Sequence, residues 1–245
     1  LVCTNARPQD MPADELCDLF DIVFKREPYL DRDRYTLSFH NKMKLRTTML
    51  SCPLVPAPRW ADMARFDASK YGASSPPPRY EYDVFFAGAA TNQHRVDIAQ
   101  ALHDRQDIHS FLSLQSRSQA SVEGMPFEGA RMSKRDYARL SRASKVNLAL
   151  EGIGPFTYRH LELLALSGFF LSTPKIKELE LPITLADGTH YISYDSADDL
   201  ADKALYYASH DDERQAIAAS GRAAFVRDYN FKKHGEYIAS VLKRT

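Results

Sequence analysis

Apolar and polar residues alternate regularly from about residue 80 to the end of the sequence. Short apolar runs at 82–87, 108–114, 146–150 and 169–171 are typical of buried strands, and a shorter strand is expected at 191–194. Apolar residues at three- and four-residue spacing predict helices at 92–104, from Ser133 onward, around Arg159, and at 197–209, 211–227 and 231–242, with a short element at 176–181. Strands that alternate with helices predict an α/β fold, a Rossmann-like mostly parallel sheet with helices on both faces.

The first 60 residues follow a different pattern. A strand is expected at 21–25, and prolines at 53, 56 and 58 interrupt regular structure. We interpret residues 1–60 as the remnant of an N-terminal domain with its connector, 61–79 as a Pro/Ser-rich linker that includes ASSPPP, and 80–245 as the Rossmann-like domain. A sequence that starts at Leu1 rather than at methionine suggests a processed piece or a fragment of a longer chain.

The amino-acid composition makes some classes of binding partner and some cellular locations less plausible. The chain has 32 basic and 32 acidic residues and a formal net charge of +0, so no global positive field would attract DNA or RNA. Cys3, Cys17 and Cys52 lack metal-ligand spacing, which favours a reducing compartment. No segment has the roughly 20 apolar residues of a membrane span, and the start has no secretory signal pattern. We expect a cytoplasmic protein without a transmembrane segment, and leave peripheral membrane association and oligomeric state open.

Three loops at predicted strand ends, 88–92, 151–159 and 187–190, carry the candidate ligand-binding residues. In sheets of this kind ligands bind outside the carboxyl ends of the strands. The first loop contains Gly88, Ala89 and Thr91 and runs into a helix, so its backbone N–H groups suit a phosphate. It is neither G-x-G-x-x-G nor a Walker loop, and a tight turn without a ligand is the alternative.

The second loop leads to two charged residues three positions apart, Arg159 and Glu162, which share one face of the predicted helix. The planar guanidinium suits a diphosphate and the carboxylate suits both ribose hydroxyls. The alternative is an exposed ion pair that contributes about 0.5 kcal/mol. Glu151 directly follows a strand and precedes Gly152 and Gly154. It is placed to act as a base or to hold sugar hydroxyls, with a loop or cap carboxylate as the alternative.

Other chemistries have less support. The eight histidines form no H-E-x-x-H motif or close cluster with cysteine or aspartate, so no metal site is predicted. The absence of G-x-S-x-G weakens a hydrolase interpretation. We expect His94, His190 and His234 at the surface, although His190 lies in the third candidate loop.

Several segments, in their order along the chain, carry a resemblance to a known family. They are YDVFFAG followed by Arg95, YARLSRASKVNL at 137–148, YRHLELLALSGFFL at 158–171, DDL at 198–200 and RQAIAASGR at 214–222. Together they resemble the donor-binding half of GT-B glycosyltransferases, and are most similar to the spore-maturation-protein-B type of family-1-like transferases. The resemblance covers about residues 80–243.

The resemblance implies that residues 80–245 bind a nucleotide sugar. By analogy, Glu162 would hold the ribose, and Arg159 would face the diphosphate with Gly88, Ala89 and Thr91. Arg95 and Tyr158 would belong to the same donor site. Glu151 to Gly154 would lie near the sugar, with Glu151 as the catalytic candidate. Related retaining enzymes have two glutamates eight positions apart, whereas Glu151 and Glu162 are eleven apart, so neither retention nor inversion is predicted.

We therefore expect a glycosyltransferase that moves a sugar from a nucleoside diphosphate sugar to a glycan, a lipid-linked glycan or a protein, with the donor as substrate and no cofactor. A GT-B enzyme also has an N-terminal domain, and the resemblance implies that only its last part is present, which leaves open whether this chain acts alone. The alternative is a non-catalytic docking or scaffold module derived from a glycosyltransferase. The nucleotide, the sugar, the acceptor and any use of metal are not predicted.

Overall fold

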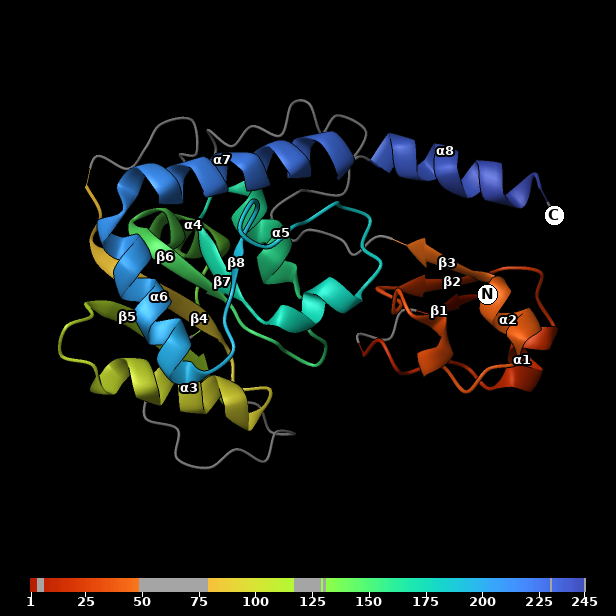
Figure 1. The fold of residues 1–245 in the computed structure, drawn as a ribbon, viewed down its shortest axis with the longest axis horizontal. Helices are drawn as coiled ribbons and strands as arrows, with labels where there is room; N and C mark the ends of the chain where they lie inside the picture. Colours follow the sequence, from red (N-terminus) through yellow and green to blue (C-terminus); the bar gives the residue numbers. More distant parts are fainter. Residues whose placement is uncertain (4–6, 49–78, 117–128, 130, 230, 245) are drawn as a thin grey trace.

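The computed structural model describes residues 1–3, 7–48, 79–116, 129, 131–229 and 231–244. The described part of the chain contains two β-sheets, each made of parallel strands (Figure 1). The larger sheet has the strand order β5-β4-β6-β7-β8, and every neighbouring pair is parallel. Its strands are β4 (Tyr82–Ala89), β5 (Ser110–Gln115), β6 (Ser144–Ala149), β7 (Phe170–Ser172) and β8 (Ile192–Ser193).

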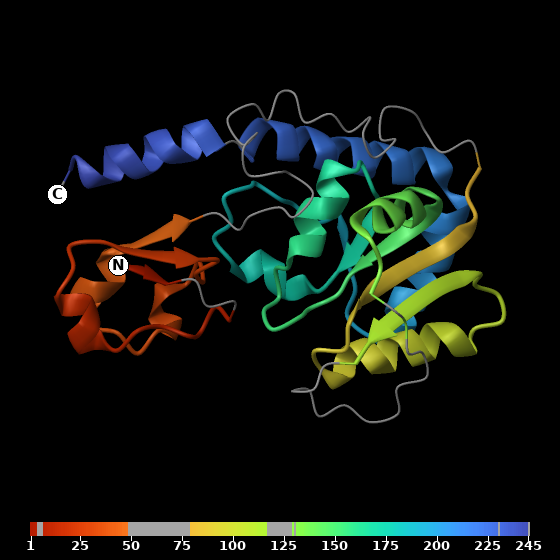
Figure 2. The ribbon, with the colours of Figure 1, turned by 180° about the vertical axis from the view of Figure 1, so that it is seen from behind.

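Helices cover both faces of this sheet (Figures 1 and 2). One face packs against α3 (Gln93–Asp104) and α6 (Ala197–Ser209), the other against α4 (Lys134–Arg142), α5 (Tyr158–Ala165) and α7 (Asp211–Asp228). Side chains on β4 alternate between the two: Val84 and Phe86 join the first core, Phe85 and Ala87 the second. The expected Rossmann-like parallel sheet with helices on both faces is confirmed.

The smaller sheet has the order β1-β2-β3, also parallel, with β1 (Val2–Cys3), β2 (Val23–Arg26) and β3 (Leu45–Thr48). The helices α1 (Asp14–Asp18) and α2 (Phe39–Met43) and the 3₁₀ turn η1 (Arg32–Arg34) accompany it. Its core centres on Cys17, Val23, Tyr35, Leu37 and Leu45. We call these residues, 1–48, the first unit, and residues 79–244 the second unit.

Backbone pairing joins the two units. Tyr29 forms an isolated antiparallel bridge with Leu179, just after the 3₁₀ helix η4 (Pro174–Glu178). The Leu30 N–H donates to the Glu178 carbonyl oxygen and the Glu180 N–H to that of Pro28, both at 2.8 Å.

The last helix, α8 (Phe231–Leu242), leaves the larger sheet and lies beside the smaller one in both views (Figures 1 and 2). His234 Nε2 on this helix is 3.3 Å from Thr48 Oγ1 at the end of β3. Two segments far apart in sequence therefore contact the first unit, the residues around η4 and helix α8.

The structure differs from the sequence-based expectations in three places. Gly88 and Ala89 continue strand β4 rather than forming a turn, because β5 pairs Leu114 and Gln115 with them. Strand β3 at Leu45–Thr48 was not predicted, because its alternation of buried and half-buried residues is only four residues long. The element expected at 176–181 is a 3₁₀ helix that starts earlier, at Pro174.

The predicted linker at 61–79 lies outside the described residues, apart from its last residue. The division of the chain at residues 60 and 79 stays a prediction. Ser133 does cap α4 as expected, and its hydroxyl oxygen accepts the Asp136 N–H at 3.1 Å.

Candidate functional site

The strand order places a switch point between β4 and β6. The chain leaves β4 toward α3 on one face of the sheet, and leaves β6 toward α5 on the other. Loops that depart in opposite directions leave a crevice at the carboxyl edge, which is where open α/β sheets bind ligands. The first two candidate loops of the sequence meet at this point.

Arg159, at the start of α5, lies against the end of β4. A Cβ atom added to Gly88 would be only 2.6 Å from Arg159 Nη1, so the guanidinium occupies the space that a side chain would take. Its Cζ atom is 5.3 Å from the ring centre of Phe86 and 5.1 Å from that of Tyr137, and Nε donates to the Tyr137 hydroxyl at 3.2 Å. The two aromatic rings thus stabilise the positive charge of Arg159 beside the switch point through cation–π interactions.

Glu162 lies one turn further along α5 and is partly buried. Its carboxylate forms no hydrogen bond or ion pair with a residue in the described part of the chain. Burial raises the pKa of Glu162, while the positive charges of Arg159 and Lys134 oppose that rise. A carboxylate that is half withdrawn from water and has no internal partner retains its capacity to accept hydrogen bonds from a ligand.

Arg95 ties the two loops together. Its side chain is buried, and Nε donates to the Glu151 carbonyl oxygen at 2.7 Å, Nη1 to that of Ala89 at 2.7 Å, and Nη2 to that of Leu150 at 2.9 Å. Asn92, the N-cap of α3, adds a bond from Nδ2 to the Gly152 carbonyl oxygen at 2.9 Å. Arg95 therefore fixes the backbone of the site, a positioning role that the sequence pattern does not distinguish from direct ligand contact.

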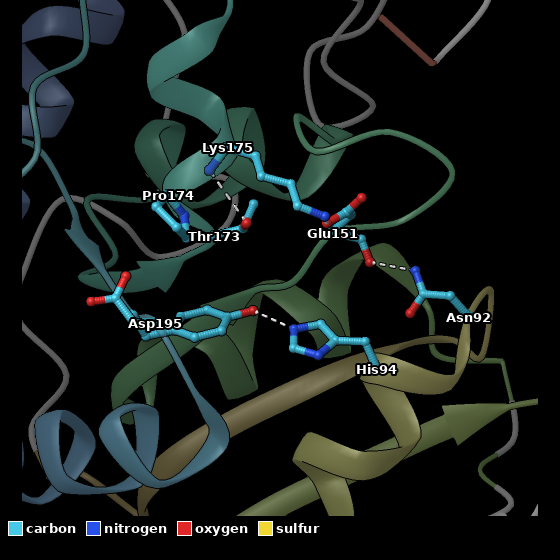
Figure 3. A pocket seen from close by; sticks show the side chains of 8 residues that line it. Asn92, His94, Glu151, Thr173, Pro174, Lys175 and Asp195 are labelled. Carbon is cyan, nitrogen blue, oxygen red and sulfur yellow. Dashed lines mark hydrogen bonds and ion pairs between the residues drawn. The ribbon is translucent and has the colours of Figure 1, made fainter. Parts of the chain in front are cut away.

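Glu151 lies at the rim and lines two cavities. Its Oε2 atom is 2.8 Å from Lys175 Nζ, on η4 just after β7 (Figure 3). The first cavity, about 440 Å³, is lined by residues that follow four neighbouring strands: Asn92, His94, Glu151, Thr173, Pro174, Lys175, Tyr194 and Asp195. The second, about 380 Å³, lies between the units and includes Pro8, Gln9, Tyr29 and Arg34 of the first unit as well as Glu151 and Lys175.

His94 is exposed, as expected, and it also lines the first cavity. Its Nε2 atom is 3.1 Å from the Tyr194 hydroxyl, and the two rings stack. Burial lowers the pKa of His94, with the nearby Glu151 opposing. Sequence reasoning did not select His94, Lys175 or Tyr194. The available signal was position, since each follows or ends an element at the carboxyl edge.

The other predicted site residues lie around the same edge. Thr91 follows β4, and its buried hydroxyl has no hydrogen-bond partner in the part of the chain that is described. Gly154 is buried and its carbonyl oxygen accepts the Gly152 N–H at 3.0 Å. Tyr158 opens α5 and is 45% exposed. The structure brings these residues near the switch point, and their roles stay predictions.

In the third candidate loop, the side chains of Asp187 and His190 are bound to neighbouring groups of the protein. The Asp187 carboxylate accepts the Ser193 N–H at 2.7 Å and pairs with Lys177 Nζ at 2.6 Å. His190 Nδ1 accepts the Ala186 N–H at 2.8 Å. Neither side chain lines the two cavities just described.

Within the described ranges, no three His, Cys, Asp or Glu side chains gather into a potential metal site. A search of the same residues finds no helix with both the length and the apolar character needed to cross a membrane.

Residues 91–240 match a family model described as glycosyl transferase-like. HepE from Anabaena, in a crystal structure with UDP and glucose, is similar with a TM-score of 0.60 at 11% identity, covering 100% of this chain and 71% of that chain. A glycosyltransferase from Rickettsia africae gives 0.60 at 12% identity with the same coverage of both chains, 100% and 71%.

The sucrose-phosphate synthase of Thermosynechococcus elongatus is similar with a TM-score of 0.55 at 11% identity, covering 94% of this chain and 60% of that chain. A comparison of the sequence with curated proteins gives no match. At such identities these structures establish a shared fold.

Proposed function

This chain belongs to the glycosyl transferase-like family, and from that premise we propose that it transfers a sugar from a nucleoside diphosphate sugar to an acceptor. The resemblance to family-1-like GT-B transferases is thereby confirmed, and the matched residues 91–240 fit their C-terminal half. We propose that this half binds the donor and that the first unit is part of an N-terminal domain. The nucleotide, the sugar and the acceptor are the subject of the proposal.

The observation that carries the proposal is the arrangement of Arg159, Glu162 and Gly88. A side chain at residue 88 would exclude the guanidinium, so the absence of a Cβ atom lets Arg159 reach the switch point. Glu162, one turn away, has a carboxylate with no partner among the described residues. A cation and an acceptor group so spaced on one helix suit the diphosphate and the ribose of a donor.

The similarity to HepE from Anabaena supports this proposal. HepE from Anabaena has the same fold and was crystallised with UDP and glucose. By analogy we place the donor of this chain across the switch point, with its nucleoside toward Glu162 and its sugar toward Glu151. Arg159 would stabilise the negative charge that grows on the diphosphate as the bond to the sugar breaks.

The acceptor is proposed to enter the cavity between the units. Glu151 lines both this cavity and the first one, and its loop lies at the switch point where we place the donor. Its carboxylate is suitably placed to contact a sugar hydroxyl or to accept a proton from the acceptor. The cytoplasmic location expected from the sequence is also retained as a proposal.

Titration calorimetry tests the donor site. UDP, GDP, ADP, CDP and dTDP are titrated separately into the wild-type chain, and the tightest is then used with Glu162→Ala. Hydrogen bonds to a charged group contribute about 1.5–3 kcal/mol, so we expect affinity to fall roughly tenfold to a hundredfold. Glu236→Ala, which removes an exposed carboxylate on α8, is the matched control and should bind as the wild type does.

The outcomes separate the two functions considered. Binding that depends on Glu162, together with release of nucleoside diphosphate from the matching sugar donor, supports a transferase. If none of the five nucleotides binds to the folded wild-type chain, the proposal fails and a docking or scaffold role becomes the better explanation. Circular dichroism of each variant shows whether a lost affinity reflects lost structure.

A further inference from the structure

One ion pair separates the two cavities at the carboxyl edge of the sheet. Glu151 and Lys175 line both cavities, and their Oε2 and Nζ atoms are 2.8 Å apart. Figure 3 shows the Lys175 side chain extending from the start of η4 toward Glu151. The pair thus lies between the cavity assigned to the acceptor and the first cavity, which borders the loop after β4 through Asn92 and His94.

The backbone around Lys175 is fixed while its ammonium stays accessible. Pro174 stands at the start of η4, and the Lys175 N–H donates to the Thr173 hydroxyl at 3.4 Å. The Lys175 side chain is 58% exposed and that of Glu151 is 23% exposed. Ion pairs with this much exposure are weak, so the ammonium can exchange its partner for a stronger anion at little cost.

Besides Arg159, two other cations near this edge, Arg95 and Arg34, are already bound to groups of the protein. The Arg95 guanidinium bonds to the carbonyl oxygens of Ala89, Leu150 and Glu151. Arg34 pairs with Glu178 and lies over the ring of Tyr29. Of the described residues that line the first cavity, Lys175 alone carries a permanent positive charge.

We propose that Lys175 is a binding residue for the diphosphate of the donor, and that the bound diphosphate draws its ammonium away from Glu151. This inference rests on the proposed function and extends it. A nucleotide held at Glu162 and Arg159 has its diphosphate beside the loop after β4, and Asn92 and His94 at the start of α3 connect that loop to the first cavity. Removing Lys175 from the pair leaves the Glu151 carboxylate free for hydroxyl groups of the sugar or of the acceptor.

The test is a comparison of nucleotide affinities by calorimetry. With the tightest-binding nucleoside diphosphate as probe, Lys175→Ala should weaken binding roughly tenfold or more, whereas affinity for the corresponding nucleoside should stay unchanged. Lys175→Arg should recover most of the affinity. Lys177→Ala is the matched control, because Lys177 lies on the same 3₁₀ helix and is also paired with a carboxylate, that of Asp187.

A second variant distinguishes two explanations. Either Lys175 exchanges Glu151 for the diphosphate, or the charge of Glu151 simply repels the diphosphate. Glu151→Gln should tighten binding of the nucleoside diphosphate, because the Lys175 ammonium then has no competing carboxylate. In the Lys175→Ala background the same substitution should give little or no gain. An equal gain in both backgrounds would show that Glu151 merely repels the anion, and the exchange would be refuted.

The failures of the two proposals are distinguishable. If Lys175→Ala, folded by circular dichroism, binds the nucleoside diphosphate as tightly as the wild type while Glu162→Ala does not, the role of Lys175 is overturned and the donor site stands. If Lys175→Ala is not folded, Lys175→Met gives the same comparison. A wild-type chain that binds no nucleotide overturns both proposals.

Discussion

At the scale of single residues, His160 has a protonation state fixed by its surroundings. The side chain is fully buried on α5, Nδ1 accepts the Thr157 N–H at 3.0 Å, and Nε2 is 2.8 Å from the Ser172 hydroxyl. A ring that accepts at Nδ1 and donates from Nε2 is the neutral tautomer. Burial accordingly lowers the pKa of His160 to about 3.

This neutral histidine predicts a sensitivity to acid. The folded pKa lies below the unfolded value near 6.5, so the contribution to stability is present above pH 6.5 and is lost as the pH falls toward about 3. His160→Gln keeps an acceptor and a donor without a titrating ring. The free energy of unfolding in urea should therefore fall with acid more steeply in the wild type than in the variant, by up to about 1.4 kcal/mol per pH unit. His103→Gln, at an exposed position of α3, is the control, and parallel pH profiles for wild type and His160→Gln would contradict the prediction.

At the scale of elements, local pattern was sufficient for most of the fold. The strands and helices from β4 to α8 arise from apolar spacing and caps such as Ser133, which are properties of neighbouring residues. The Lys175–Glu151 pair joins residues 24 positions apart and depends on the parallel pairing of β6 with β7. The role of Arg95 could not be predicted from the sequence for the same reason. Its side chain donates hydrogen bonds to carbonyl oxygens of a second loop, and only the fold brings that loop close.

Helix packing gives a prediction at this scale. A Cβ atom on Gly221 of α7 would lie 2.8 Å from the His190 carbonyl oxygen and 2.9 Å from Leu164 Cδ2, whereas one on Gly235 of α8 meets no atom within 4 Å. Gly221→Ala should lower the free energy of unfolding by about 1–2 kcal/mol, since overpacking outweighs the gain in helix propensity. Gly235→Ala should raise it by up to about 1 kcal/mol. Urea unfolding of both variants checks the pair, and a stabilised Gly221→Ala would show that α7 can move away from the loop.

At the scale of the whole molecule, Glu27 is a buried carboxylate in the first unit. Its effect on how stability changes with pH is opposite in sign to that of His160 in the second unit. Glu27 directly follows strand β2, has a φ of 55° and is 1% exposed. Its carboxylate oxygens have no hydrogen-bond partner in the described chain, although Arg26 Nε lies 3.1 Å away. Burial raises the pKa of Glu27 to about 7, against the charges of Arg26 and Lys25. The folded state therefore holds a proton that the unfolded state releases above pH 4.5, and stability is lost as the pH rises through about 7.

The titrations of Glu27 and His160 can be used to test whether the two units unfold together. Glu180 accepts from Arg32 and Thr47, the Tyr29–Leu179 bridge lies beside it, and α8 returns to β3, so we expect one cooperative transition. In that case the opposite slopes of Glu27 and His160 act on the same free energy and largely cancel between pH 4.5 and 6.5. Glu27→Gln should then make the single transition more sensitive to acid, and His160→Gln should make it less so.

Differential scanning calorimetry of both variants across this pH range provides the measurement, with equal calorimetric and van't Hoff enthalpies as the sign of one transition. Two separate transitions, of which Glu27→Gln shifts only one and His160→Gln only the other, would show that the units fold independently. The cavity between them would then be a surface whose shape depends on how the units are oriented. One transition that responds to both variants would instead mean that Tyr29 and Arg34 are held in place beside Glu151 and Lys175, as an acceptor site requires.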